Sequence, residues 1–538
     1  MESSQGQDKH EEPGEAENIL ELLENMKQEI WTRRPILGNI MKKHGEDSLH
    51  RYAQDFMDVN NITHLDTRKP ELIDTATELV RARLGDDVAM RVGKQLAKLP
   101  LVSTTDHHGP ITHPFFVNSN IISAIPYFGS QDTDLNSLVV FSFASVSTNN
   151  ASAYPRGILF HGGADGSGNL IRLPILPDKL KMGVVYGMRP FTREDLTKAE
   201  AELYKKEKAG EIASGRADQV RNLLEKFFAR PDVLSASDLA SQISIINYHL
   251  WPTLFHTAET DGLSAAPGTV TNGGRQTIPD LLYLEIETLV TELLLRHHLP
   301  KTDTLIYRLL FEPTFRTLSA QHFNNIPGAF SIEKQWGTHM FWAVDEKLHR
   351  VRLILQDGKL ISDDGLFIYD FTPDSIAQLL KEKKIFPSML LCYVMVSLYY
   401  GMKCLGGFSQ VNDLTRTKEA WQEILRAVDE TTEADAIMAV QTKELGGDGM
   451  VLAYHRTGEL DMVPATGIDM ALKKSDTTFA KYVARSKELT MSEIMQPMIP
   501  EMYTVLYPIQ DRKPEYNAVT PEKILRKTSL LQKLTAGQ

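Results

Sequence analysis

Apolar positions in the N-terminal part of the chain recur at the spacing of helices. Two runs carry this pattern: Ile19, Leu20, Leu22, Leu23 and Met26 and, after Pro70, Leu72, Ile73, Ala76, Leu79 and Val80. Residues that recur every three or four positions share one face of a helix. We therefore expect a helical region over residues 17–100. Residues 1–16 are polar and acidic, and we expect them to form a disordered lead-in.

The pattern changes after residue 100. Residues 137–147, 157–161 and 169–176 form short runs rich in apolar residues, with Gly and Pro between them. Short apolar runs bounded in this way are typical of strands joined by loops. We expect a central α/β unit over residues 101–190.

Helical spacing returns over residues 191–335, where we expect one long helix from Pro279 to His298. Alternating polar and apolar residues then predict a β-hairpin within Thr338–Ile361, with Asp357-Gly358 as its turn. The remainder of residues 336–538 is expected to be rich in helices. The fold class is therefore a mixed α/β protein with a helical N-terminal layer, a central α/β unit and an α-rich C-terminal portion.

Composition and charge exclude several classes of function. The chain has 538 residues, with 58 Lys plus Arg against 70 Asp plus Glu and a net charge of −12. An acidic chain lacks the overall electrostatic attraction for nucleic acid or anionic membranes, so we expect neither as a partner. The N-terminus has no basic segment followed by an apolar one, as an export signal would, and a cytoplasmic protein is expected. The oligomeric state is left open.

Two further features bear on compartment and class. The longest apolar stretch, Phe386–Met402, is at the lower limit for a membrane span, and a buried core helix is the preferred interpretation. The chain has two cysteines, Cys392 and Cys404, too few for a disulfide framework or a four-cysteine zinc site.

The clearest candidate for chemistry is the segment Thr104–Asn120, TTDHHGPITHPFFVNSN. It holds one carboxylate, Asp106, and three imidazoles, those of His107, His108 and His113. Zinc, iron and manganese bind such ligands, and His also serves as an acid or base near neutral pH.

We predict a site for a divalent metal ion (zinc, manganese or iron) formed by Asp106, His108, His113 and the downstream His161. His107 and His108 are the predicted catalytic groups. The structural alternative is that these histidines donate hydrogen bonds to loop carbonyls or cap the helix that follows.

The segment follows a short apolar run, as a loop after a strand would. Sites in open α/β sheets lie at the carboxyl ends of strands. Strand alternation sends His107 and His108 to opposite sides, so that both bind one ion only where the chain has left the strand.

Two families share features with this segment. The triplet Asp106-His107-His108 after an apolar run resembles the signature of DHH phosphoesterases, manganese enzymes that cleave phosphodiesters and pyrophosphate. Those proteins also carry Asp-x-Asp carboxylates on preceding strands, and residues 1–100 contain no Asp-x-Asp. The segment Asp106–Phe115 is also similar in spacing to a loop of bacillithiol-synthase-like proteins. That loop contains a pair of polar residues, then a Pro, then a small residue followed by a second Pro, after which a helix begins. In this sequence two His residues replace the polar pair.

A second cluster, Thr148–Gly168, combines polar residues with five glycines. Glycine lets backbone N–H groups approach an anion, and Arg offers a forked set of donors. We predict Asn149, Asn150, Gly163 and Asp165 as substrate-binding residues, and Arg156 as a catalytic residue that holds an anionic group. The simpler interpretation is a turn between two strands. Convergence of both clusters on one pocket requires their strands to be neighbours.

These residues favour an enzyme that acts on a small anionic or amide-containing metabolite. Metal-assisted hydrolysis is the most concrete form of this hypothesis, because a metal ion held by three His or Asp ligands keeps one coordination position open for a water molecule. One alternative is a metal-free transferase or condensing enzyme with a His base and a Gly-rich anion site. The other is a non-catalytic binding or scaffold protein.

Overall fold

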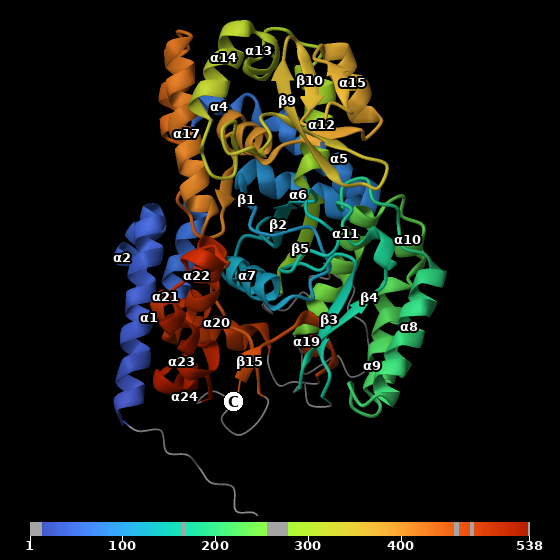
Figure 1. Ribbon diagram of the computed structural model, residues 1–538, viewed down its shortest axis with the longest axis vertical. Helices are drawn as coiled ribbons and strands as arrows, with labels where there is room; N and C mark the ends of the chain where they lie inside the picture. The colour runs from blue at the N-terminus through green and yellow to red at the C-terminus, as the bar shows by residue number, and fades with distance from the viewer. Residues whose placement is uncertain (1–12, 164–167, 256–277, 457–461, 474–477, 536–538) are drawn as a thin grey trace, which may run out of the picture.

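The computed structural model describes residues 13–163, 168–255, 278–456, 462–473 and 478–535 (Figure 1). A four-stranded parallel sheet lies near its centre, with helices packed around it. The strands are β1 (Leu101–Ser103), β2 (Ser137–Ser142), β5 (Asp280–Glu285) and β13 (Lys403–Leu405), in the order β13-β1-β2-β5. The expectation of a mixed α/β fold is confirmed.

This sheet separates two hydrophobic cores. Successive residues of a strand point to opposite faces, and here they enter different clusters. One cluster takes Leu101, Leu138, Val140, Leu281 and Tyr283, and the other takes Val102, Val139, Phe141, Leu282 and Leu284. A sheet buried on both faces explains why its strands carry continuous apolar runs rather than an alternating pattern.

The N-terminal residues are helical, as expected. The helices are α1 (Pro13–Arg33), α2 (Pro35–His44), α3 (Leu49–Gln54), α4 (Thr63–Asp66), α5 (Lys69–Leu84) and α6 (Asp86–Lys98). Helix α1 begins at Pro13, so the last residues of the expected lead-in are helical, while residues 1–12 lie outside the described part. Proline at the first helical position is favourable because its missing N–H would have no partner there.

Between β1 and β2 the chain forms α7 (Pro114–Ala124). The longer connection from β2 to β5 contains β3 (Gly157–His161), β4 (Leu170–Pro174), α8 (Arg193–Lys208), α9 (Arg216–Leu223), α10 (Pro231–Leu234) and α11 (Leu239–Leu250). Strands β3 and β4 form a separate antiparallel pair. The parallel sheet thus takes strands from three of the regions distinguished in the sequence.

The predicted helix Pro279–His298 is wrong in its first part. That part is β5, and only then do α12 (Ile286–Leu293) and the π-helix η6 (Leu294–His298) follow. The physical reason is burial: β5 pairs with β2 along its length, and its apolar residues enter both cores. Such a run carries no alternation that would distinguish it from a buried helix.

The predicted hairpin is confirmed. Strands β9 (Arg350–Gln356) and β10 (Lys359–Ser362) pair antiparallel around Asp357-Gly358. Both turn residues have positive φ, 49° and 73°, as a tight two-residue hairpin turn requires. The hairpin belongs to a five-stranded sheet with β8 (Phe341–Val344), β11 (Ile368–Asp370) and β12 (Ile385–Pro387).

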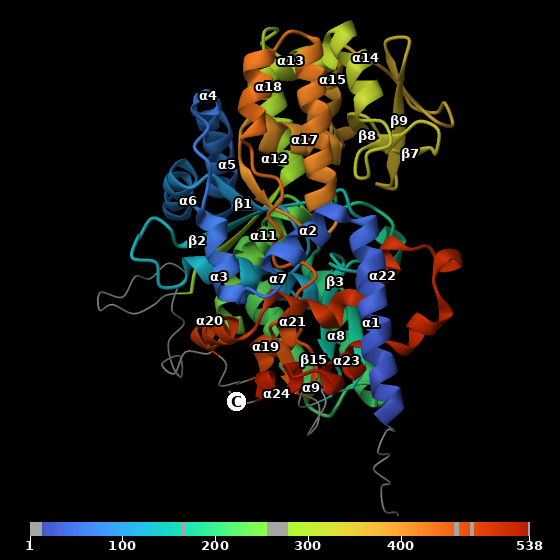
Figure 2. The same cartoon turned by 90° about the vertical axis from the view of Figure 1, so that its left-hand side faces the viewer.

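The remaining elements surround these sheets. Before and beside the five-stranded sheet lie α13 (Leu305–Phe311), α14 (Pro313–His322), β6 (Phe330–Ser331), β7 (Trp336–Gly337) and α15 (Pro373–Lys381). Then follow α16 (Met389–Tyr393), α17 (Gln410–Ala427), α18 (Thr431–Met438), β14 (Tyr454–Arg456), β15 (Met462–Pro464), α19 (Gly467–Leu472), α20 (Phe479–Glu488), α21 (Met491–Met495), α22 (Ile499–Leu506), α23 (Pro521–Lys527) and α24 (Leu530–Thr535). Helix α1 lies alongside α22, so the two ends of the chain meet (Figures 1 and 2).

Short 3-10 and π-helical turns complete the described elements. They are η1 (Asp55–Met57), η2 (Ile125–Tyr127), η3 (Asp178–Leu180), η4 (Leu224–Phe228), η5 (Trp251–Leu254), η7 (Val394–Tyr399), η8 (Gln496–Met498), η9 (Ile509–Asp511) and η10 (Pro514–Ala518). The apolar stretch Phe386–Met402 spans β12, α16 and η7, and most of its side chains are buried. In the described residues, no helix has both the length and the apolar character needed to cross a membrane.

Candidate functional site

The His-rich segment continues the parallel pairing beyond the ends of β1 and β2, with Phe143 as its partner. The Phe143 N–H donates to the Asp106 carbonyl at 2.9 Å, and the His108 N–H donates to the Phe143 carbonyl at 2.8 Å. His107 forms the parallel bridge with Phe143. The backbone is therefore extended here, and alternation places Asp106 and His108 on one side and His107 on the other.

On the inner side, Asp106 is fully buried among hydrogen-bond donors. Its carboxylate accepts from the Thr105 hydroxyl at 2.6 Å, from Asn120 Nδ2 at 2.6 Å and from the Tyr283 hydroxyl. Burial raises the pKa of Asp106, and these donors counteract part of that rise. Asn120 Nδ2 also donates to the Tyr283 oxygen at 2.8 Å. The group thus joins α7 to β5 and to the segment that follows β1.

His108 is the second buried group on this side. Its Nε2 lies 2.9 Å from the Ala240 carbonyl, which only accepts, so Nε2 carries the proton. Its Nδ1 therefore accepts from the Ser142 hydroxyl at 2.7 Å. Burial lowers the pKa of His108 to about 3 and keeps the ring neutral. Both ring nitrogens are bonded to protein, which matches the structural alternative for this residue.

On the outer side, Asn150 orients His107. Asn150 Oδ1 accepts from the backbone N–H groups of Ser152 and Ala153, both at 3.1 Å, which identifies it as the oxygen. His107 Nδ1 lies 3.0 Å from the same oxygen and must therefore be the protonated nitrogen. Burial lowers the pKa of His107, the bond to Asn150 opposes this, and Arg350 adds to the lowering. The lone pair of this partly exposed imidazole is thus on Nε2.

His113 has the opposite tautomer. It is the N-cap of α7, and its Nδ1 accepts from the Phe115 N–H at 3.2 Å. The proton of the neutral ring is therefore on Nε2. Burial lowers the pKa of His113 to about 3, with smaller contributions from Arg172 and His107. His113 thus caps a helix, as the structural alternative proposed, and still presents an N–H donor.

Phe116 packs against both His107 and His113. Its ring centroid lies 5.8 Å from that of His107 and 6.3 Å from that of His113. Two arginines act on them electrostatically, Arg350 on His107 and Arg172 on His113. Both arginines are exposed, and no ion pair joins either one to another described residue.

Arg156 is already bonded within the protein. Its guanidinium donates to Asp178 and to the Leu176 carbonyl, both at 3.1 Å, while its Nε is buried without a partner in the described structure. It lines an apolar cavity of about 10 Å³ together with Pro110. A space of this size holds about one water molecule. Arg156 thus lies next to the His-rich loop, in a space too small for a metabolite.

His161, at the end of β3, belongs to a separate cluster. Its Nδ1 lies 2.6 Å from Asp469, which also accepts from Arg216 at 2.5 Å and from Thr466 at 2.7 Å. Asp469 and Arg216 are buried. This group ties β3 to α9 and α19, and among the described residues no hydrogen bond, ion pair or ring contact joins it to Asp106, His108 or His113.

The other predicted binding residues are scattered. Asn149 is exposed, with its backbone N–H bonded to the Lys181 carbonyl at 3.1 Å. Gly163 lies in the bend after β3, and Asp165 lies outside the described residues. The structure thus brings together His107, His113 and Asn150 from the two predicted clusters. For the predicted ligands Asp106, His108, His113 and His161, no group of three or more His, Cys, Asp or Glu residues in the described part is arranged to hold a metal ion.

Sequence inspection missed several residues of this region. Ser152 carries a detectable signal, because Asn commonly bonds to backbone two residues on and the predicted residue Asn150 lies two positions before it. Phe116 follows the histidines in the same segment. Arg172, Arg350 and Tyr283 come from other strands, and no local pattern connects them to the loop. Searches among protein family models and among curated proteins find no match for this chain.

Proposed function

We propose that this protein is an enzyme acting on a small anionic or amide-containing metabolite through acid–base chemistry at His107 and His113. The observation that carries the proposal is the opposite tautomers of two neutral histidines that share Phe116. One presents a lone pair on Nε2 and the other an N–H. An available base and an available hydrogen-bond donor packed against one phenyl ring are the two groups that proton transfer at a carbonyl or phosphoryl group needs.

In the proposed reaction, His107 Nε2 removes the proton from an attacking hydroxyl, water or amine. The lowered pKa of His107 keeps it unprotonated at neutral pH, ready to accept that proton. Asn150 holds its Nδ1–H, so the tautomer does not change before reaction. His113 Nε2–H donates to the substrate oxygen on which negative charge develops, and a neutral imidazole is suited to this role.

Charge supports an anionic substrate. Arg172 and Arg350 lie near the two histidines, and neither is neutralised by a described carboxylate. An unpaired guanidinium is a forked donor for a carboxylate or phosphate. These two residues take the anion-binding role that the sequence suggested for Arg156.

Hydrolysis or group transfer without a metal is the version that the described contacts support. All four residues predicted as ligands have a ligand atom bonded within the protein: Asp106 to Tyr283 and Asn120, His108 to Ser142 and Ala240, His113 Nδ1 to Phe115, and His161 Nδ1 to Asp469. These bonds would have to break before the residues could share an ion. The zinc, manganese or iron site stays a hypothesis that reconstitution with each metal tests directly.

The test is turnover of a defined mixture of phosphate esters, carboxylates and carboxamides, followed by proton and phosphorus NMR. The wild-type protein should consume at least one component. His107→Gln should slow that reaction by a factor of about 10²–10⁴, the usual worth of a general base. His322→Gln is the matched control, because His322 is a partly exposed histidine paired with Glu423 far from the site.

Two outcomes contradict the proposal. Equal turnover by the wild-type and His107→Gln proteins would show that another group is the base. Binding of a component by the wild-type protein without any consumption, at several pH values and with added zinc, manganese or iron, would make the protein a binding module.

A further inference from the structure

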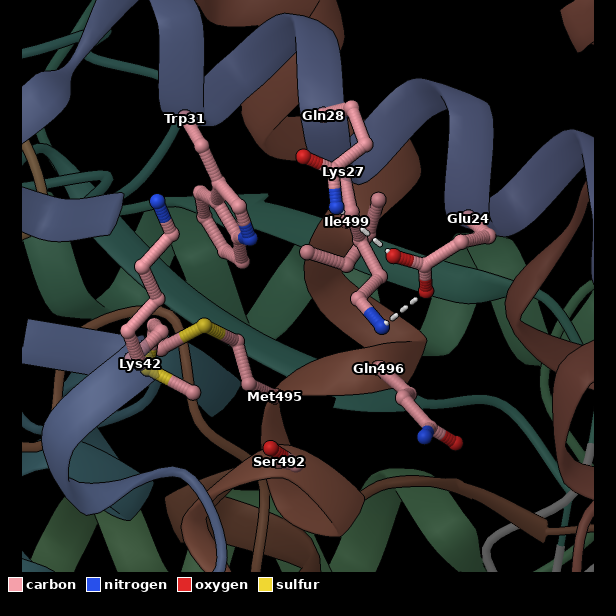
Figure 3. Close-up of a pocket in the computed structure, with 10 residues that line it drawn as sticks. Glu24, Lys27, Gln28, Trp31, Lys42, Ser492, Met495, Gln496 and Ile499 are labelled. Atoms are coloured by element: carbon pink, nitrogen blue, oxygen red, sulfur yellow. Dashed lines mark hydrogen bonds and ion pairs between the residues drawn. The ribbon is translucent and has the colours of Figure 1, made fainter. Parts of the chain in front are cut away.

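A separate pocket lies where the two ends of the chain meet. Helices α1 and α2 form one wall, and α21, η8 and the start of α22 form the other (Figure 3). Its volume is about 160 Å³. The lining residues are Glu24, Lys27, Gln28, Trp31, Met41, Lys42, Ser492, Met495, Gln496 and Ile499. None of them belongs to the histidine site.

The walls of this pocket are fixed by close packing. A Cβ on Gly38 would lie 2.9 Å from Trp31 Cβ, so only glycine lets α2 approach Trp31 this closely. On the opposite wall, the Ser492 N–H donates to the Gly45 carbonyl at 2.9 Å, and a Cβ on Gly45 would meet the Ser492 hydroxyl at 2.6 Å. A pocket held in this way is preorganised, which lowers the cost of binding.

The middle of the pocket is apolar and suits a flat ring. Trp31, Met41, Met495 and Ile499 supply one aromatic, two thioether and one aliphatic side chain. Thioethers and aromatic faces both make favourable contacts with aromatic rings. A cavity of about 150 Å³ accommodates benzene, so the space matches a single six-membered ring.

The polar groups at the pocket differ in whether they already have partners. Glu24 is occupied, since it accepts from Lys27 at 2.6 Å and from Gln28 at 2.8 Å. Lys42, in contrast, forms no ion pair with any described residue. Gln496 Oε1 is a buried acceptor with no donor in the described structure. Figure 3 shows Lys42 beside Trp31 at one end of the pocket and Gln496 towards the other end.

We propose that this pocket binds a small aromatic carboxylate that carries a hydroxyl group at the far end of its ring. The ring packs against Trp31, Met495 and Ile499. The carboxylate pairs with Lys42, and the hydroxyl donates to Gln496 Oε1, which satisfies the buried acceptor. Nothing in this assignment depends on the histidine site or its proposed chemistry.

The test uses 4-hydroxybenzoate as the probe, with benzoate and 4-hydroxybenzamide as controls, measured by calorimetry and ligand-detected NMR on the full chain. 4-Hydroxybenzoate should bind with a Kd of about 1 mM or below, as a well-placed ligand of this size can. Benzoate lacks the donor and should bind about fivefold more weakly. The uncharged amide should bind about tenfold more weakly.

Two variants assign the contacts. Lys42→Gln should weaken 4-hydroxybenzoate binding about tenfold, while Lys43→Gln, the adjacent exposed lysine, should leave it unchanged. Gln496→Leu should abolish the preference for 4-hydroxybenzoate over benzoate. The proposal would be overturned if Lys42→Gln and Lys43→Gln weakened 4-hydroxybenzoate binding equally, or if the wild-type protein bound no 4-hydroxybenzoate at about 10 mM. If Gln496→Leu does not fold, the ligand series on the wild-type protein still decides the role of the hydroxyl.

Discussion

The two sides of the His-rich loop differ in what their polar atoms bind. On the inner side, the Asp106 oxygens and both nitrogens of His108 have partners within the protein. On the outer side, His107 has only its Nδ1 bonded to a described residue, and the same holds for His113, the buried N-cap of α7. Adjacent residues in the sequence thus have opposite environments, because the backbone remains extended through residues 106–108.

This difference separates residues that stabilise the fold from residues that can take part in a reaction. A buried polar group with all its bonds made holds elements together, and removing it leaves its partners unsatisfied. A partly exposed imidazole with one nitrogen fixed and one available can react. A run of histidines is therefore not one functional unit, and strand alternation divides this one into a structural half and a candidate catalytic half.

The largest effect should appear in stability. His108→Ala should lower the free energy of unfolding by about 3–5 kcal/mol, because it leaves a cavity and removes the hydrogen-bond donor of the buried Ala240 carbonyl. His107→Ala should cost only about 1 kcal/mol, since its ring is partly exposed and makes one clear hydrogen bond. Urea denaturation followed by circular dichroism measures both.

Ser142→Ala provides the control for the inner side. It removes one hydrogen bond to His108 and keeps the imidazole ring. Ser142→Ala should therefore lower the free energy of unfolding by about 1–3 kcal/mol, which is less than the effect of His108→Ala. If His107→Ala lowered the free energy of unfolding as much as His108→Ala, the division of the loop into a structural side and a candidate catalytic side would be contradicted.

The second effect is chemical reactivity. Diethyl pyrocarbonate acylates accessible, unprotonated imidazole nitrogens, and His107 should react at least about tenfold faster than His108, which must first be exposed by local opening. Mass spectrometry of the modified peptide distinguishes the two adjacent sites. Asn150→Ala frees Nδ1 of His107 and should allow modification at either nitrogen, with His322 as the unchanged reference. Comparable rates at His107 and His108 in the wild-type protein would show that the loop is not held as described.

The fold could be anticipated from the sequence only where the signal is local. The β9–β10 hairpin was predictable because its strands alternate and Asp357-Gly358 has the chemistry of a tight turn. Strand β5 was not, because burial on both faces removes alternation and leaves an apolar run that also fits a helix. The parallel sheet itself joins β1 to β13, which no local pattern reports.

The same limit applies to the site. The cluster of His107, His108 and His113 is visible in the sequence, and so is the rule that alternation separates the first two. Their partners are not visible, because Asn150 lies 43 residues from His107 and Asp469 lies 308 residues from His161. Which histidine packs inside and which reacts depends on these distant contacts.

The third effect is a dependence of stability on pH. His108 has a folded pKa of about 3 against about 6.5 unfolded, so below pH 6.5 the unfolded chain takes up a proton that the folded chain does not. This lowers the free energy of unfolding by about 1.4 kcal/mol for each pH unit between 6.5 and 3, and the stability is fully present above pH 6.5. His108→Gln should remove that slope, while His113 retains its own. Denaturation curves at pH 7.5, 6.5 and 5.5 measure the difference, and an unchanged slope in His108→Gln would contradict the burial of a neutral ring.

The smallest effect concerns the charge on the outer side. Arg350 lowers the pKa of His107, so Arg350→Gln should raise that pKa and reduce the unprotonated fraction at acidic pH, in the range where this imidazole titrates. In that acidic range the rate of His107 acylation at low salt should fall about twofold, as expected for an exposed charge worth a few tenths of a kcal/mol, and the effect should vanish at high salt. Arg352→Gln is the matched control, since Arg352 lies on the same strand and is paired with Asp363. If Arg352→Gln changed the rate as much as Arg350→Gln, the field at His107 would come from the whole strand, and the outer side would have no specific anion-binding arginine.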